Sequence, residues 1–203
     1  MKEDITFQPV PLFNRKIDIN GNYVPFHGYT IMSHVEHPLP EQLVKLHEYL
    51  VRSKFSDYFS FLPKFSYHVT LNPLINVEMK RDEAILKEAQ MNIDKLETGT
   101  KCMVKQLTRK DKLQLEIELI EPFLNTILKP LQAQWTKLDT ILMKYEEKWH
   151  LTLAYQYRNI TDEAQVILDE IIKNWTQFPF EISLDPITIC EHQDMTDYVA
   201  IFD

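Results

Sequence analysis

Two short phrases of one pattern constrain most strongly what this 203-residue chain can fold into. The first is "YHVTL", which begins at Tyr67, and the second is "WHLTL", which begins at Trp149. Each reads aromatic, His, aliphatic, Thr, Leu, and composition alone predicts such a phrase only ~10⁻³ times in the chain. The repetition indicates either two strands held to one chemical task or a duplicated half whose similarity survives mainly in these two stretches.

The first phrase predicts an amphipathic strand, because side chains alternate between the two faces of a strand. His68 and Thr70 then share one face, with Asn72 beside them, and Val69 and Leu71 point toward the core. A single His-x-Thr on a strand is usually structural, since Thr favours strands and a half-buried His is usually hydrogen-bonded. Two matching copies reverse that balance in favour of a functional role.

The second phrase gives the same division. His150 and Thr152 share the polar face, whereas Leu151 and Leu153 point toward the core. Tyr155 has the opposite parity to His150 and is interpreted first as a core residue. A bulge after the motif would instead turn Tyr155 toward the polar face, where its ring could stack on a nucleobase. If the two strands lie side by side or one strand apart, both imidazoles and both hydroxyls line one groove.

This set of groups suits the chemistry of a phosphodiester. One imidazole can accept a proton from the attacking oxygen while the other donates a proton to the leaving oxygen. Two hydroxyls can donate hydrogen bonds to the non-bridging oxygens, where charge grows in the transition state. The scheme requires no metal and no cofactor. The sequence therefore nominates His68 and His150 as catalytic, and Thr70, Thr152, Tyr155 and Asn72 as substrate-binding residues.

The remaining sequence predicts an α+β fold with a largely antiparallel sheet, because hairpins occur among mixed strands and helices. Strands are predicted over 28–35, 64–71, 99–108, 112–120, 148–157, 180–192 and 197–203. Helices are predicted over 39–51, 78–93, 121–138 and 161–175, the third kinked at Pro130 and the fourth capped by Thr161. No linker interrupts the chain, so a single domain over 1–203 is expected, with 1–23 as an N-terminal extension.

Composition limits the partners. A net charge of −8 argues against wrapping long duplex nucleic acid, which requires many Lys and Arg contacts, but permits a nucleotide, a cyclic nucleotide or a short RNA. The basic run from Lys105 to Lys112 is interpreted as a solvated hairpin tip, or alternatively as a guide for a phosphate-bearing ligand. The N-terminus does not resemble a signal peptide and no stretch resembles a membrane span, so we expect a cytoplasmic monomer with reduced Cys102 and Cys190.

The phrases "HVTL" and "HLTL", about eighty residues apart, resemble the paired His-x-Thr signature of the two-histidine (2H) phosphoesterase superfamily, which includes LigT-like RNA 2′,3′-cyclic phosphodiesterases. "GNYVPFHGYT" at 21–30 resembles the opening of a less characterised branch. The resemblance implies two pseudo-symmetric lobes around a central cleft and metal-independent catalysis. It also implies that His68 and His150 are catalytic and that Thr70 and Thr152 bind phosphate. No lysine-plus-glutamate nucleotide-transfer motif of an RNA ligase is found, so hydrolysis is favoured over joining.

Three functions remain open at this stage. The leading hypothesis is hydrolysis of a 2′,3′-cyclic phosphate, a 2′-5′ linkage, a cyclic dinucleotide or an RNA 3′ end, with His150 as base and His68 as acid by resemblance to relatives. The second is a non-catalytic module on the same fold that binds nucleotides or RNA ends. The third is a structural protein in which both histidines belong to the core.

Overall fold

The structure is a computed structural model that describes residues 16–75, 83–93, 99–121, 123–135, 148–176 and 179–202. Nine strands of these residues form one sheet in the order β7-β4-β5-β6-β3-β1-β8-β9, and β2 pairs with β6. Their bounds are β1 Gly28–His34, β2 Phe59–Phe61, β3 His68–Ile75, β4 Thr100–Arg109, β5 Lys112–Leu119, β6 Trp149–Gln156, β7 Phe180–Leu184, β8 Thr188–His192 and β9 Tyr198–Ala200. The described strand pairs are antiparallel. The predicted α+β fold with antiparallel sheet is confirmed.

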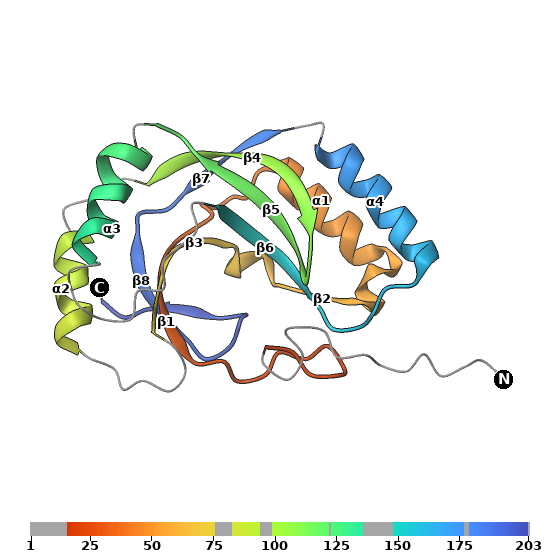
Figure 1. Ribbon diagram of the computed structural model, residues 1–203, viewed down its shortest axis with the longest axis horizontal. Helices are drawn as coiled ribbons and strands as arrows, with labels where there is room; N and C mark the ends of the chain where they lie inside the picture. Colours follow the sequence, from red (N-terminus) through yellow and green to blue (C-terminus); the bar gives the residue numbers. More distant parts are fainter. Residues whose placement is uncertain are drawn as a thin grey trace.

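The strand order can be divided at the junction of β3 and β6, which lie at the centre of the view (Figure 1). One half runs β7-β4-β5-β6 and the other runs β3-β1-β8-β9. The register at the junction pairs Val69 with Leu151. Each of these residues follows a motif histidine, so the junction lies between the two phrases.

Four α-helices occur among the described residues: α1 Glu41–Arg52, α2 Glu83–Ile93, α3 Lys129–Trp135 and α4 Asp162–Thr176. Figure 1 shows α1 and α4 at one end of the view and α2 and α3 at the other. Helix α1 buries Leu43, Leu46 and Leu50, which recur at the spacing of one helical face. Helix α4 begins as predicted, because the Thr161 Oγ1 accepts a hydrogen bond of 3.3 Å from the Ala164 N–H.

Three predicted elements differ in the structure. The helix expected over 121–138 consists of a π-helix, η3 Phe123–Leu128, followed by α3, so the irregular segment precedes Pro130. Pro130 lies in the first turn of α3, directly after η3, and its nitrogen cannot donate to a carbonyl of the preceding turn. The strand expected over 180–192 is divided around Pro186 into β7 and β8. The strand expected from 64 begins at His68, because Lys64–Ser66 form a 3₁₀ turn. Residues 78–82, 122 and 136–138 of the predicted helices lie outside the described residues.

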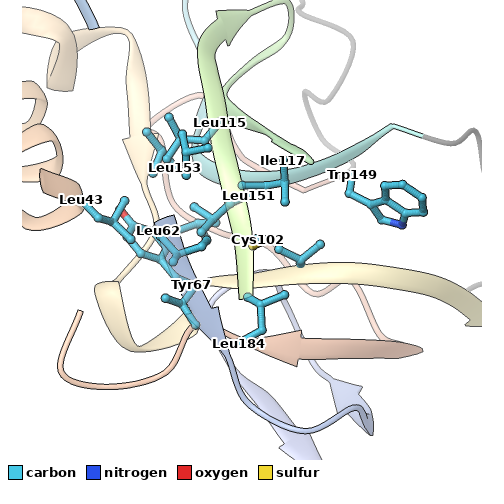
Figure 2. Packing of buried hydrophobic residues seen from close by; sticks show 14 of the residues in the cluster. Leu43, Leu62, Tyr67, Cys102, Leu115, Ile117, Trp149, Leu151, Leu153 and Leu184 are labelled. Atoms are coloured by element: carbon cyan, nitrogen blue, oxygen red, sulfur yellow. The ribbon is translucent and has the colours of Figure 1, made fainter. Parts of the chain in front are cut away.

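The apolar face of the sheet carries the core. Tyr67 and Leu62 from one part of the chain gather near Leu151 and Leu153 from another (Figure 2). The same apolar cluster includes residues of α1, α2 and α4, so these helices pack on this face. Cys102 and Cys190 are buried free thiols, as expected. None of the described helices has the length and apolar character needed to cross a membrane.

Candidate functional site

The two motif strands meet at the centre of the sheet. Val69 pairs with Leu151, and in an antiparallel ladder this register sets His68 opposite Thr152 and Thr70 opposite His150. Val69 and Leu151 are fully buried, whereas the four motif residues keep part of their surface exposed. The two His-x-Thr sets therefore lie together on the face of the sheet opposite the core.

Both motif strands bulge just after the threonine. On β3, Thr70 pairs with Met32 and Asn72 pairs with Ile31, so Leu71 is the extra residue. On β6, Thr152 pairs with Gln114 and Ala154 pairs with Leu113, so Leu153 is the extra residue. We call the face of the sheet that carries His68, Thr70, His150 and Thr152 the motif face. A bulge shifts the alternation of side chains by one residue, so the residues after each bulge point to the opposite faces from those that strict alternation predicts.

The bulge on β3 changes the placement of Asn72 from the one predicted. Asn72 lies opposite Ile31, which belongs to the core cluster, and only 4% of Asn72 is exposed. Strict alternation from His68 does not extend past Leu71, so Asn72 does not share the motif face with Thr70. Its Nδ2 has no hydrogen-bond partner among the described residues.

The bulge on β6 has the opposite consequence for Tyr155, because it turns this side chain to the motif face. The Tyr155 hydroxyl shares a side-chain hydrogen bond with Thr152. The Tyr23 ring packs edge-on against Tyr155 at 6.2 Å, and the Lys16 ammonium lies 5.1 Å from the Tyr155 ring centroid. Tyr155 is thus on the side that the bulge hypothesis required, but the segment from Lys16 to Phe26 helps to leave it only 5% exposed.

His68 lies in a largely aromatic environment. Its Nδ1 donates a hydrogen bond of 2.7 Å to the Ser66 carbonyl, which leaves the lone pair of the neutral ring on Nε2. The Tyr198 ring packs 4.2 Å from the imidazole and the His34 ring lies 6.3 Å away. Burial lowers the pKa of His68 to about 3; the Ser66 hydrogen bond opposes that shift, and charge on His34, His192 or His150 would lower the pKa further.

His150 lies among charged groups. The Lys112 ammonium donates a hydrogen bond of 2.8 Å to the His150 Nε2, and a Lys148 backbone hydrogen bond stabilises the protonated ring. Burial lowers the pKa of His150 to about 4. The charge of Lys112 lowers it further, as does that of Lys16, whereas Asp111 acts in the opposite direction. Both pKa values lie below 7, so both motif imidazoles are neutral at pH 7 in this structure.

Three further residues belong to this region although the sequence did not mark them individually. Lys112 ends the basic run from Lys105 and contacts His150, so the charge pattern was a usable signal. Tyr198 and His192 come from the C-terminal strands, and their rings lie 5.2 Å apart. The His192 Nδ1 donates a hydrogen bond of 2.7 Å to the Phe26 carbonyl. Nothing local marks Tyr198 or His192, because they reach the site only through the order of strands.

A surface cavity of about 520 Å³ lies elsewhere, around the start of β4 and the loop after β7. Its charged lining is mixed, with Glu36, Glu121, Asp185 and Lys101, and it contains none of the four motif residues. We place the candidate site at the motifs, because volume without convergent catalytic groups identifies no chemistry. Within the described ranges, no three His, Cys, Asp or Glu side chains are grouped so that they could hold a metal ion.

Comparison with known proteins identifies relatives at two levels. The model of the 2H-phosphodiest family, described as a domain of unknown function (DUF1868), matches residues 16–123. No functionally curated protein matches the chain in sequence.

Solved structures share the fold at low sequence identity. A conserved protein of unknown function from Agrobacterium tumefaciens superposes with a TM-score of 0.74 at 14% identity, covering 97% of this chain and 94% of that one. E. coli LigT complexed with 3′-AMP gives a TM-score of 0.60 at 12% identity, covering 87% and 96%. A protein described as a phosphoesterase gives 0.58 at 11% identity, covering 88% and 97%.

Proposed function

This chain belongs to the 2H-phosphodiest family of the 2H phosphoesterase superfamily, and from that premise we propose that it is a metal-independent phosphodiesterase acting on a nucleotide or short oligonucleotide. Family membership supports phosphodiesterase-type chemistry. The observation that carries the proposal is the pairing of Val69 with Leu151, because this register brings both His-x-Thr sets onto one face at the centre of the sheet.

The proposed reaction is attack of water on the phosphorus of a cyclic or linear diester. One imidazole takes a proton from the water through Nε2 as the new P–O bond forms. The other imidazole, as imidazolium, gives a proton to the leaving ribose oxygen as its P–O bond breaks. Thr70 and Thr152 donate hydrogen bonds to the non-bridging oxygens, which carry the growing negative charge. The product is a phosphomonoester.

The charged groups around the histidines support a division of roles. An imidazole beside an ammonium resists protonation, so His150 with Lys112 at 2.8 Å suits the base, which must be neutral at the start. His68 instead has two aromatic rings as neighbours, those of Tyr198 and His34. A bound phosphate anion raises the pKa of His68 without competing with an adjacent ammonium. We therefore assign His68 as the acid for hydrolysis.

The substrate classes to test are 2′,3′-cyclic phosphates, 2′-5′ linkages, cyclic dinucleotides and RNA 3′ ends. That E. coli LigT was solved with 3′-AMP supports including nucleoside phosphates among the ligands. Tyr155 lies on the same face as Thr152 and is our candidate for contact with a nucleobase. Asn72 is buried opposite Ile31 on the core face, so we do not propose it as a substrate contact.

The deciding experiment is a turnover screen of these four classes in the presence of EDTA, with the double variant His68→Gln/His150→Gln as control. We expect one class to be hydrolysed by the unaltered protein and none by the control. Binding of a nucleotide without turnover in any class would contradict catalysis and favour the binding-module hypothesis. Turnover that EDTA abolishes and added metal restores would contradict the metal-independent mechanism.

A further inference from the structure

Within the basic run from Lys105 to Lys112, it is Lys112 that forms a hydrogen bond with a motif histidine, His150. It is the first residue of β5, and its Cα partner on β6 is Tyr155. The side chain therefore extends along the neighbouring strand to reach His150, five positions before Tyr155. By contrast, the Lys105 ammonium is directed to the Glu118 carboxylate at 2.7 Å and is half-exposed. Two lysines of one run thus have different surroundings.

The hydrogen bond between Lys112 and His150 has a defined direction. An ammonium only donates, so the His150 Nε2 must accept with its lone pair, and the proton of the neutral ring resides on Nδ1. Nε2 is also the atom that would accept the proton of the attacking water. While Lys112 donates to this lone pair, the atom cannot act as a base. This hydrogen bond therefore blocks the group on which hydrolysis depends.

We propose that Lys112 binds the phosphate of the substrate and, in moving to it, uncovers the Nε2 of His150. This inference rests on the proposed phosphodiesterase function and adds a residue to its site. An N–H of an ammonium forms a stronger hydrogen bond with an anionic phosphate oxygen than with a neutral imidazole. An ammonium carries three N–H groups, so Lys112 can donate to the phosphate oxygens once it turns away from the ring. Only a hydrogen bond moves; no covalent bond changes in this step.

The base then operates only when an anion occupies the site. Lys112 becomes a phosphate ligand during the reaction, because its charge lies beside the oxygens that become more negative in the transition state. The phosphate also separates the two cationic groups, which lets His150 hold the proton that it takes from water. The other charged groups around His150 keep their positions in this step. The ionisable groups that face or adjoin His150 are Lys112 on β5, Asp111 just before β5, Glu116 as the Cα partner of His150 on β5, Lys16 in the N-terminal segment and His68 on β3.

The kinetic test compares three variants. Lys112→Met keeps the length of the side chain but removes the charge, and we expect kcat/KM to fall by about 10²-fold or more. Lys112→Arg keeps the charge and should recover part of that loss. Lys105→Met, from the same basic run and outside the site, should retain the kcat/KM of the unaltered protein. Unchanged kcat/KM in a folded Lys112→Met would overturn the proposal.

The second test does not depend on turnover. Imidazole NMR of the protein with ¹⁵N-labelled histidine gives the titration midpoint of His150 directly. Removing the Lys112 charge should raise that midpoint by about one pH unit or more, because a neighbouring cation disfavours the imidazolium. Adding inorganic phosphate should raise the midpoint in the unaltered protein and have a much smaller effect in Lys112→Met. A His150 midpoint that is the same in both proteins, with and without phosphate, would overturn the coupling.

The two tests separate failure of the inference from failure of the proposed function. If no substrate class is turned over but phosphate shifts the His150 midpoint through Lys112, the function fails and the anion site remains. If turnover is found but Lys112→Met behaves like the unaltered protein, only the inference fails. If Lys112→Met does not fold, the NMR signals of the Lys112 side chain in the unaltered protein decide, because phosphate must shift them if the ammonium moves.

Discussion

His68 and His150 occupy equivalent positions on β3 and β6, yet the groups around them differ in kind. Each is followed by a buried aliphatic residue, a Thr and a bulge, and each has a backbone hydrogen bond to the residue two positions before it. His68 is packed against Tyr198, whereas His150 contacts Lys112. The backbone repeats a geometry, and the residues contributed by other strands distinguish the two imidazoles. The scaffold is thus symmetric, and the proposed division into acid and base rests on the groups that surround each imidazole.

Removing either imidazole should have the largest effect on kcat/KM. His68→Gln and His150→Gln should each lower kcat/KM by about 10³-fold, because each half of the proton transfer needs its own group. The double variant should be little worse than either single variant, since groups that act as one unit are not additive. Steady-state kinetics of the three proteins on the substrate found in the screen provide the measurement.

A substrate with an activated leaving group separates the two roles, because it needs no general acid. His68→Gln should recover most of its activity on that substrate and His150→Gln should not. Recovery of His150→Gln instead would reverse the assignment of acid and base. Equal, large losses in both variants on both substrates would argue against acid–base catalysis by these two residues.

Replacing the two motif threonines tests whether the two motifs contribute equally to turnover. Thr70→Val and Thr152→Val keep the shape and the strand preference but remove a donor, so each should slow turnover by about 10²-fold with little change in the unfolding midpoint. Because the register sets each threonine opposite the histidine of the other motif, the two losses should be similar. Full activity in both variants would show that neither hydroxyl contacts the phosphate in the transition state.

The pH dependence of stability tests the environments of the two rings without a substrate. The folded pKa values of about 3 for His68 and about 4 for His150 lie below the ordinary value of 6.5, mainly because the rings are buried. Below pH 6.5 the unfolded chain therefore binds protons that the folded protein does not. Stability is fully present above pH 6.5 and falls as the pH drops toward these folded values.

Urea unfolding at pH 7 and pH 4.5 measures this loss. His68→Gln and His150→Gln should each show a smaller drop in midpoint between the two pH values than the unaltered protein. His37→Gln, which changes an exposed side chain, should show the same drop as the unaltered protein. A drop that is identical in all four proteins would contradict the origin assigned to it.

The smallest expected effect concerns the aromatic neighbour of His68. Tyr198→Leu removes the phenol ring that packs against the His68 imidazole. The imidazole then becomes more hydrated, so the pKa of His68 should rise toward 6.5. The pKa of His150 should stay the same. Histidine NMR titration of this variant and of Val199→Ala, an exposed residue of the same strand, checks the difference. A shift in both imidazoles would indicate that the two environments are not separate.

The sequence was sufficient wherever the pattern is local. Helix α4 was predicted because Thr161 caps a periodic apolar segment, and the β4–β5 hairpin because two alternating runs flank the residues 109–111. The placement of Asn72 and Tyr155 could not be predicted with certainty, because a bulge depends on which residues the neighbouring strand presents. Tyr198 and Lys112 reach the histidines through strand order and side-chain length, and neither property is encoded in the motif itself.

The pairing of Val69 with Leu151 also bears on how the chain folds. These residues are far apart in sequence, at positions 69 and 151, whereas the β4–β5 hairpin closes over the short turn between Arg109 and Lys112. Closing a long loop costs more conformational entropy than closing a short one, and non-local pairings slow the search for the native state. The hairpin can therefore form early, while the two histidines become neighbours only when the distant halves of the chain dock. A partly folded chain that has every helix and hairpin still lacks the paired motifs.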